Sequence, residues 1–153
     1  MRLVKPLIEA MKLEDLDEVM AIEHACFPTP WPRRIFEMEL KSKRSLKIVS
    51  RMRGVVSGYI VAWMIHDEGH ILNVAVHPDF RRLGIAETLM KDCLGYFTQK
   101  KARYAILEVR RSNVGAIKLY EKFGFKSVGI RRGYYTDTDE DAIVMMLDMS
   151  GQI

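Results

Sequence analysis

A short basic turn between an apolar run and a helical pattern is the stretch of this sequence whose residue types favour binding chemistry. The apolar residues 73–76 predict a buried strand, which Pro78 ends. Arg81, Arg82 and Gly84 follow, and a helical pattern begins directly after them. The first N–H groups of a helix have no intrahelical partners, and the helix dipole adds positive charge there. The stretch therefore predicts an anion site, and the arginines favour a phosphate-bearing ligand.

The same residues could instead form a solvated loop that only joins a strand to a helix. Two common nucleotide-binding motifs are absent from the sequence, since it contains neither G-x-x-x-x-G-K-[ST] nor G-x-G-x-x-G. A P-loop and a dinucleotide fingerprint are therefore excluded.

The composition of the chain is typical of one folded domain. The 153 residues are 48% apolar, and we expect a single domain over residues 1–153. No apolar run approaches the ~20 residues that span a membrane, and the N-terminus has no apolar signal-peptide core. Cys26 and Cys93 predict reduced thiols in a cytoplasmic protein. No metal site is expected, because the histidines are scattered: His24, His66, His70 and His77.

The charge of the chain is unevenly distributed. The net charge is +4, but residues 81–132 hold 13 Lys and Arg against 4 Asp and Glu. Residues 137–141 are acidic instead. The basic half suits an anionic ligand such as a phosphorylated cofactor, and it would also suit RNA or a ribosome surface. A solvated basic face explains it equally simply.

Hydrophobic periodicity and turn residues predict alternating strands and helices. The predicted strands are residues 4–10, 46–52, 55–65, 71–76, 104–109, a sixth that starts at 125–129, and 142–149. The predicted helices are residues 13–25, 33–42, 84–100 and 114–122. Turns expected at residues 53–54 and 67–70 would make the second to fourth strands an antiparallel meander. The helical crossover after the fourth strand predicts its parallel pairing with the fifth.

Local signals mark the ends of two of these helices. Pro32 is expected in the first turn of the second helix, where its missing N–H costs nothing. Ser112 or Asn113 is the natural N-cap of the last helix, and Gly124 is expected to end it.

A stiff aromatic loop joins the first two helices. Residues 26–32 contain three prolines, which exclude both helix and sheet. The loop also carries Phe27 and Trp31. It could be a simple hydrophobic plug or the wall of a substrate cleft.

Two motifs resemble a known enzyme family. Arg81, Gly84 and Ala86 fill the fixed places of R/Q-x-x-G-x-G/A, the acetyl-CoA signature of the GNAT superfamily of N-acetyltransferases. Residues 108–125 resemble the run E-V-R-x-S-N-x-x-A-I-x-L-Y-x-x-x-G-F of its RimI-like subfamily, which acetylates protein N-termini. Gly115 stands early in the last predicted helix, where a better helix former would be usual. It should destabilise that helical turn by under ~1 kcal/mol.

The resemblance implies a fold and a cofactor. The fold would be the α/β (α+β) GNAT fold, a mixed, mostly antiparallel seven-stranded sheet with a splayed parallel pair, strands four and five, flanked by four helices. The cofactor would be acetyl-CoA, with its pyrophosphate on the backbone amides of the basic turn. The implied cofactor-binding residues are Val74, Ala75, Val76, Arg81, Arg82, Leu83, Gly84, Ile85, Ala86, Glu87, Asn113 and Tyr120.

Acetyl transfer to an amine needs a base, donors for the oxyanion and an acid for the leaving thiolate. By resemblance, Glu108 is the base and Tyr120 the acid, while the backbone N–H of Val76 is the oxyanion donor. Taken alone, Glu108 could simply pair with Arg110 or Arg82, and Tyr120 lies on the apolar stripe of its helix and could simply be core.

The resemblance also implies a peptide site between two loops. One loop would contribute Phe27, Pro28 and Trp31, and the other Tyr134 and Tyr135. Tyrosine hydroxyls can bond a peptide backbone while the rings enclose a small first residue. The tyrosines could instead be a packed pair that caps the sheet.

Three functions remain open. The first is acetylation of free N-terminal α-amino groups of proteins, including the N-terminal alanine of a small-subunit ribosomal protein, by a monomer or weak dimer. The second is acetylation of a small-molecule amine or a lysine side chain. The third is a non-catalytic coenzyme- or RNA-binding module. The first is favoured, so we expect acetyl-CoA and a protein N-terminus as partners, with no membrane and no direct nucleic-acid contact.

Overall fold

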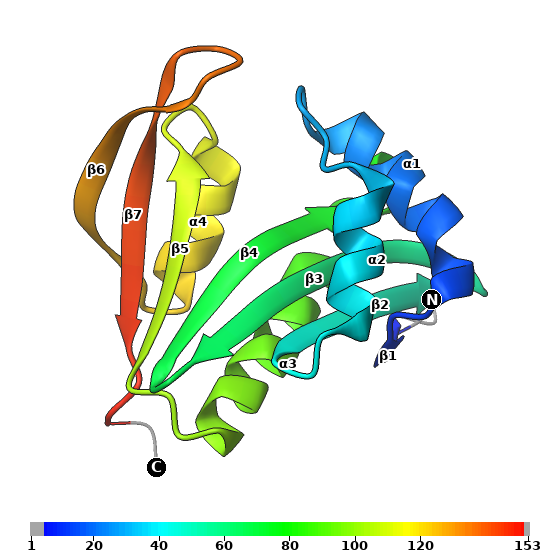
Figure 1. Cartoon of the computed structure of the whole chain (residues 1–153), viewed down its shortest axis with the longest axis horizontal. Helices are drawn as coiled ribbons and strands as arrows, with labels where there is room; N and C mark the ends of the chain where they lie inside the picture. Colours follow the sequence, from blue (N-terminus) through cyan, green and yellow to red (C-terminus); the bar gives the residue numbers. More distant parts are fainter. Residues whose placement is uncertain (1–4, 152–153) are drawn as a thin grey trace. The chain divides into compact units, whose positions relative to one another are not determined.

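The computed structural model describes residues 5–151, and its elements follow the predicted order (Figure 1). The strands are β1 Leu7–Ala10, β2 Ser45–Met52, β3 Val55–Ile65, β4 Glu68–Val76, β5 Tyr104–Arg110, β6 Lys126–Tyr135 and β7 Glu140–Asp148. The α-helices are α1 Leu16–Cys26, α2 Arg33–Lys41, α3 Ile85–Gln99 and α4 Val114–Lys122. Two short 3₁₀ helices, η1 Leu13–Asp15 and η2 Pro78–Phe80, precede α1 and α3.

Within the described residues the strands form one seven-stranded sheet in the order β1-β2-β3-β4-β5-β7-β6. β4 and β5 are parallel, whereas β1–β2, β5–β7 and β6–β7 are antiparallel. Two-residue turns join β2 to β3 and β3 to β4, which makes these pairs antiparallel too. The predicted mixed sheet with a parallel pair and four flanking α-helices is therefore confirmed.

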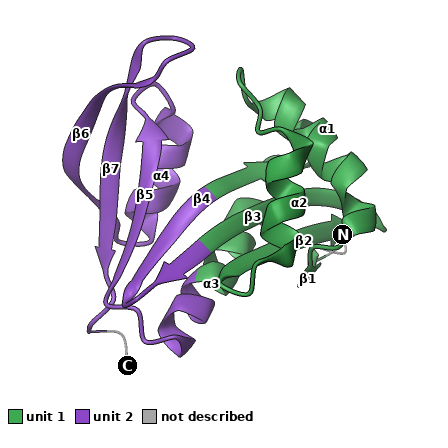
Figure 2. Ribbon diagram, viewed as in Figure 1, with its two compact units in different colours: residues 1–62, 73–93 green, residues 63–72, 94–153 purple. Residues whose placement is uncertain are grey.

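The chain divides into two compact units (Figure 2). The first contains the described residues up to Ala62 together with Asn73–Cys93, and the second contains Trp63–Leu72 and the described residues from Leu94 onward. In the first unit, β3 is buried from residue 56 to residue 62, as expected of a central strand. In the second unit, β7 pairs with β5 on one edge and β6 on the other. The expectation of a single domain over residues 1–153 stays a prediction.

The turn before β4 lies earlier than expected. It occupies residues 66–67, with His66 at φ 55°, so Gly69 lies inside β4 rather than in the turn. Packing requires a glycine at position 69, because a Cβ there would lie 2.5 Å from the ring of Phe97. A glycine that makes room for an aromatic ring cannot be distinguished from a turn glycine by sequence alone.

The prediction that Tyr134 and Tyr135 lie in a loop was wrong, because both belong to β6. Tyr135 pairs with Glu140, and the N–H of Gly133 donates to Asp141 Oδ1 at 2.9 Å. Tyrosine favours strands, and the turn-forming residues 136–139 come after the tyrosines rather than before them.

The remaining differences are small. β1 begins at Leu7, and the predicted start at residue 4 lies outside the described residues. Pro32 is the N-cap of α2, one position before its first turn. No helix in the described part of the chain is long and apolar enough to cross a membrane.

Candidate functional site

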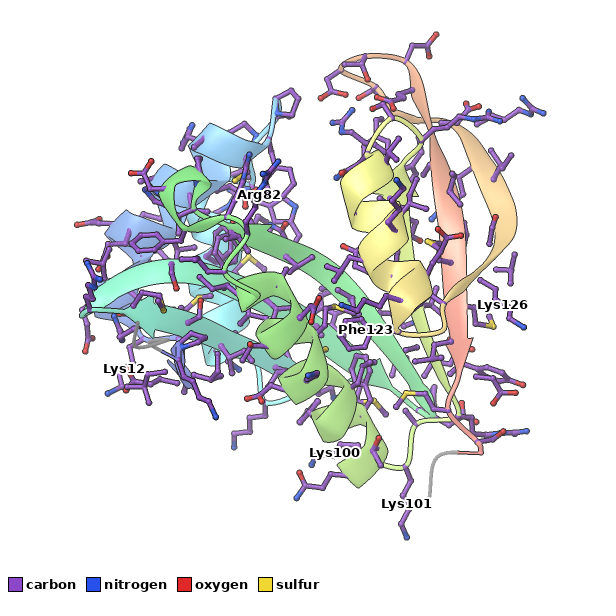
Figure 3. All side chains as sticks on the ribbon, turned by 180° about the vertical axis from the view of Figure 1, so that it is seen from behind. Lys12, Arg82, Lys100, Lys101, Phe123 and Lys126 are labelled. Atoms are coloured by element: carbon purple, nitrogen blue, oxygen red, sulfur yellow. The ribbon has the colours of Figure 1, made fainter. Side chains whose placement is uncertain are left out.

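The cradle, residues 81–87, is the stretch predicted to bind an anion, and it lies where the loop after β4 enters α3. Arg82 and Gly84 both have left-handed backbone, with φ of 66° and 76°. A Cβ on Gly84 would meet no atom within 4 Å, so the glycine serves the backbone turn and not the packing. α3 begins at the next residue, Ile85, and the N–H groups of its first turn have no intrahelical partners. Residues 81–84 are exposed, and Figure 3 shows Arg82 on this loop.

Gly58 on β3 positions the start of α3. A Cβ there would lie 2.8 Å from the carbonyl oxygen of Ala75 and 3.2 Å from side-chain atoms of Ile85 and Leu89. Ile85 and Leu89 are fully buried, so the first turns of α3 pack closely on β3 and β4 only because residue 58 has no side chain. This role could not be predicted from the sequence, since a glycine within a strand pattern is equally typical of a bulge.

The carboxyl end of β4 has one edge outside the sheet ladder. Among the described residues, the β4–β5 ladder ends at the pair Ile71 and Leu107. The N–H of His77 donates to the carbonyl oxygen of Ser57 on β3 at 2.8 Å. Because successive N–H groups of a strand point to opposite edges, the N–H of Val76 points away from β3.

Cys26 links the end of α1 to this part of β4. Its thiol donates to the carbonyl oxygen of Val76 at 3.4 Å, and Nη2 of Arg81 lies 3.5 Å from the same sulfur. In the first unit, the predicted residues Val76 and Arg81 therefore lie beside the start of the proline loop, which is the stiff aromatic loop at residues 26–32. Of that loop, Phe27 and Trp31 are partly buried and Pro28 is exposed.

A buried carboxylate that the sequence analysis missed holds the proline loop. Glu23 is 1% exposed, and its Oε2 accepts from the backbone N–H of Trp31 at 2.8 Å. Its Oε1 accepts from the hydroxyl of Tyr59 and from Nδ2 of Asn73, the latter at 2.8 Å. Burial and the neighbouring Glu23 charge raise the pKa of Tyr59, which stays a donor. The available signal was that Glu23 lies four residues after Val19 on the apolar face of α1.

Glu108 lies near the end of β5 and is partly buried. Its Oε1 accepts from Nη1 of Arg131 at 3.2 Å. The pairing with Arg110 that we considered does not form, because Arg110 binds Asp137 through two hydrogen bonds of 2.7 and 3.1 Å. Glu108 is therefore paired across to β6, where Arg131 also lies 4.6 Å from the ring of Tyr134.

Tyr120 is a core residue whose hydroxyl remains accessible. The residue is 6% exposed, and its ring lies 6.0 Å from that of Phe125. Within the described residues its hydroxyl has no hydrogen-bond partner, yet no side-chain oxygen without a partner is fully enclosed. The hydroxyl oxygen therefore reaches accessible surface. Burial raises the pKa of Tyr120, and Tyr135 raises it further.

Tyr134 and Tyr135 are fixed by two arginines. Their rings are T-shaped at 5.1 Å, and the guanidinium of Arg110 lies 4.1 Å from the ring of Tyr135. Arg110 also holds the turn after β6 through Asp137. Burial raises the pKa of Tyr135 to about 12, so the phenol is neutral at physiological pH.

Asn113 caps α4 as predicted. Its Oδ1 accepts from the N–H of Ala116 at 3.2 Å, which satisfies one of the free donors of the first turn. Gly124 follows the helix with φ 99°, as expected of a glycine that ends a helix.

The predicted site residues thus form two groups, one in each unit. The first unit holds the loop at residues 27–31, the end of β4 and the cradle at residues 81–87. The second holds Glu108, Tyr120, Asn113, Tyr134 and Tyr135. Among residues 5–151 no three His, Cys, Asp or Glu side chains gather as metal ligands.

Comparison with known proteins identifies the family. The family model described as "Acetyltransferase (GNAT) family" matches residues 16–125. A Bacillus subtilis (strain 168) protein, named as a candidate ribosomal protein bS18-alanine N-acetyltransferase, is 37% identical over 147 residues, covering 95% of this chain and 97% of that protein. The ribosomal protein bS18-alanine N-acetyltransferase of Escherichia coli (strain K12) is 33% identical over 94% of this chain and 97% of its own length.

A solved structure agrees with these matches. The crystal structure of the ribosomal-protein-S18-alanine N-acetyltransferase from Escherichia coli superposes with a TM-score of 0.87 at 32% identity, covering 95% of each chain. The resemblance found in the motifs is confirmed, and with it the fold and the cofactor. The chain belongs to the GNAT family of acetyltransferases and is an acetyl-CoA-dependent N-acetyltransferase.

Proposed function

We propose that this enzyme acetylates the free N-terminal α-amino group of proteins, including the N-terminal alanine of a small-subunit ribosomal protein. The names of its similar relatives support this substrate. The observation that carries the proposal is the Glu108–Arg131–Tyr134 arrangement, a carboxylate held beside a tyrosine surface. A carboxylate suits an incoming ammonium group, and fixed aromatic rings suit a small first side chain.

In the proposed reaction the amine attacks the thioester carbonyl, so that a C–N bond forms and the C–S bond breaks. An α-ammonium has a pKa near ~8, so Glu108 needs only to accept its proton, directly or through one water. The backbone N–H of Val76 donates to the oxyanion, which agrees with its direction away from β3. The products are an N-acetyl peptide and coenzyme A.

Tyr120 donates a hydrogen bond to the departing thiolate sulfur. A thiol has a pKa near ~8.5 and an ordinary phenol near ~10, so full proton transfer from a phenol to a thiolate is uphill. Burial raises the pKa of Tyr120 and makes that transfer more uphill. The phenol therefore acts by donating a hydrogen bond that stabilises the thiolate as it leaves. The proton that the nitrogen loses as the C–N bond forms passes to solvent, and the thiolate takes its final proton from solvent.

The remaining site residues divide between the two substrates. Residues 74–76 and 81–87 with Asn113 bind acetyl-CoA, its pyrophosphate lying on the N–H groups at the start of α3. The residues that bind the peptide are Phe27, Pro28 and Trp31 of the first unit and Tyr134 and Tyr135 of the second.

The proposal is tested by following release of the coenzyme thiol with a peptide that begins with alanine and with the same peptide blocked at its α-amine. Turnover is expected only with the free α-amine. Glu108→Gln should lower kcat by about 10²–10⁴-fold, because it removes the general base. Glu121→Gln is the control, since it changes an exposed glutamate on α4. Equal turnover of the blocked peptide, or equal activity of both variants, would contradict the proposal.

We also propose that the chain acts as a single domain over residues 1–153, as a monomer or weak dimer, in the cytoplasm. Both cysteines are free thiols, in agreement with a reducing compartment. Burial raises the pKa of Cys93, which leaves it unreactive. Cell fractionation and light scattering of the purified enzyme test these points.

A further inference from the structure

Glu23 is a buried carboxylate that no step of the proposed reaction uses. Within residues 5–151 it forms no ion pair, and its three partners are neutral donors from Trp31, Tyr59 and Asn73. A buried charge is costly unless hydrogen bonds satisfy it, and these three donors supply that stabilisation. The cluster therefore holds Trp31, Tyr59 and Asn73 around Glu23 inside the first unit.

The cluster closes a ring of contacts around the proline loop. The backbone of Trp31 is bonded to Glu23, and its indole lies 5.3 Å from the ring of Phe36. Phe36 lies 5.8 Å from the ring of Tyr59, whose hydroxyl returns to Glu23. Both the backbone and the side chain of Trp31 are thus fixed against α1, α2 and β3.

The third donor connects the loop to the strand that carries the proposed oxyanion donor. Asn73 lies on β4, three residues before Val76. Through Glu23, the loop backbone at Trp31 is tied to β4 by two hydrogen bonds of 2.8 Å each. A shift of Glu23 would therefore move the loop relative to the end of β4.

We infer that Glu23 is a positioning residue for peptide binding, which sets the place of residues 27–31 relative to β4. The inference rests on the proposed function, because it assigns Glu23 to the peptide wall of that same site. The class of substrate affected is the peptide, because residues 27–31 belong to its wall. Acetyl-CoA binding changes less, because the cradle at residues 81–87 makes no bond to Glu23 and the end of β4 stays held by the hydrogen bond from His77 to Ser57.

The chain offers a matched control on the same helix. Glu18 also lies on α1 and also bonds a backbone N–H, since its Oε2 accepts from Val56 at 2.9 Å. Its partner is at the start of β3 and not in the proline loop. Glu23→Asp and Glu18→Asp both withdraw a carboxylate by one methylene, and thermal unfolding of each variant measures the stability that it loses.

The experiment measures KM for an alanine-first peptide, KM for acetyl-CoA and kcat in both variants, with thermal unfolding as a check of folding. Glu23→Asp should raise the peptide KM about tenfold and leave the acetyl-CoA KM within about twofold, because it loses a charge-assisted bond to the loop. Glu18→Asp should leave both KM values unchanged. Tyr59→Phe, which keeps the ring beside Phe36, should raise the peptide KM less.

Trp31 emission gives a readout that needs no activity. In a Trp63→Phe background Trp31 is the remaining tryptophan of the sequence. Its emission should move to longer wavelength in Glu23→Asp but not in Glu18→Asp. The inference is overturned if peptide KM and emission respond equally in the two variants, or in neither. If the wild-type enzyme acetylates no peptide, the proposed function fails, and the emission alone then decides whether Glu23 positions the loop.

Discussion

Tyr120 combines two roles that sequence reasoning treats as alternatives. Its ring is part of the core, as the apolar stripe of its helix indicated, yet its hydroxyl oxygen is not enclosed. Glu108 likewise has a partner, but the partner is Arg131 on β6 and not Arg110, two residues further along the chain. At the scale of single residues, pairing and burial do not exclude a catalytic role. The hydroxyl of Tyr120 is still accessible, and only Oε1 of the Glu108 carboxylate bonds Arg131.

Tyr120→Phe should lower kcat by about 10²-fold while changing the peptide KM little, since the hydroxyl acts on the leaving sulfur. Because burial raises the pKa of Tyr120 above the ordinary phenol value near ~10, the wild-type hydroxyl stays protonated up to pH ~10. The profile of kcat/KM should therefore rise as the substrate amine is deprotonated near pH ~8 and stay level to pH ~10. A loss of kcat/KM between pH 8 and 10 that is absent from Tyr120→Phe would contradict this role.

At the scale of elements, the site depends on close packing between α3 and two strands. The cradle needs the helix N-terminus near the end of β4, and Gly58 provides that approach. The motif at residues 81–86 could be recognised in the sequence. The glycine that positions it, Gly58, could not, because the atoms that leave no room for a side chain there belong to residues distant in sequence.

Gly58→Ala should raise the acetyl-CoA KM and lower the free energy of unfolding by about 1–3 kcal/mol, because the new Cβ overlaps the carbonyl oxygen of Ala75. Titration with acetyl-CoA and urea unfolding measure both effects. Gly95→Ala is the control within α3, since a Cβ there meets no atom within 4 Å. It should raise the free energy of unfolding by about 0.5–1 kcal/mol. Unchanged acetyl-CoA binding in Gly58→Ala would contradict the positioning of α3.

At the scale of the whole molecule, the order and type of the elements could be predicted, because periodicity, caps and turn residues all agree. Arg53 and Gly54 form the expected tight turn with φ of 54° and 81°, and Asn113 caps α4. Tyr134 and Tyr135 were misplaced because their strand is exposed and shows no buried alternation. The Glu23 cluster was missed because its donors come from residues 31, 59 and 73, which only the fold brings together.

The stability of the whole chain should fall in alkaline solution. Burial raises the pKa of Tyr59, Cys93, Tyr120 and Tyr135, so above pH ~9 the unfolded chain loses protons that the folded chain keeps. Each group then lowers the free energy of unfolding by up to about 1.4 kcal/mol per pH unit, and contributes no such loss below its unfolded pKa. Urea unfolding from pH 8 to 11 measures this slope. Tyr120→Phe should have a shallower slope than the wild type, and parallel slopes would contradict the assignment.

The most direct test of the account is to locate the acetyl group in one peptide that has both an N-terminal alanine and an internal lysine. The peptide is incubated with the enzyme and acetyl-CoA, and tandem mass spectrometry identifies the modified nitrogen. We expect acetyl on the α-nitrogen, with none on the lysine, and loss of that product in Glu108→Gln. Acetyl on the lysine, or an α-acetyl product that Glu108→Gln forms as fast as the wild type, would contradict it.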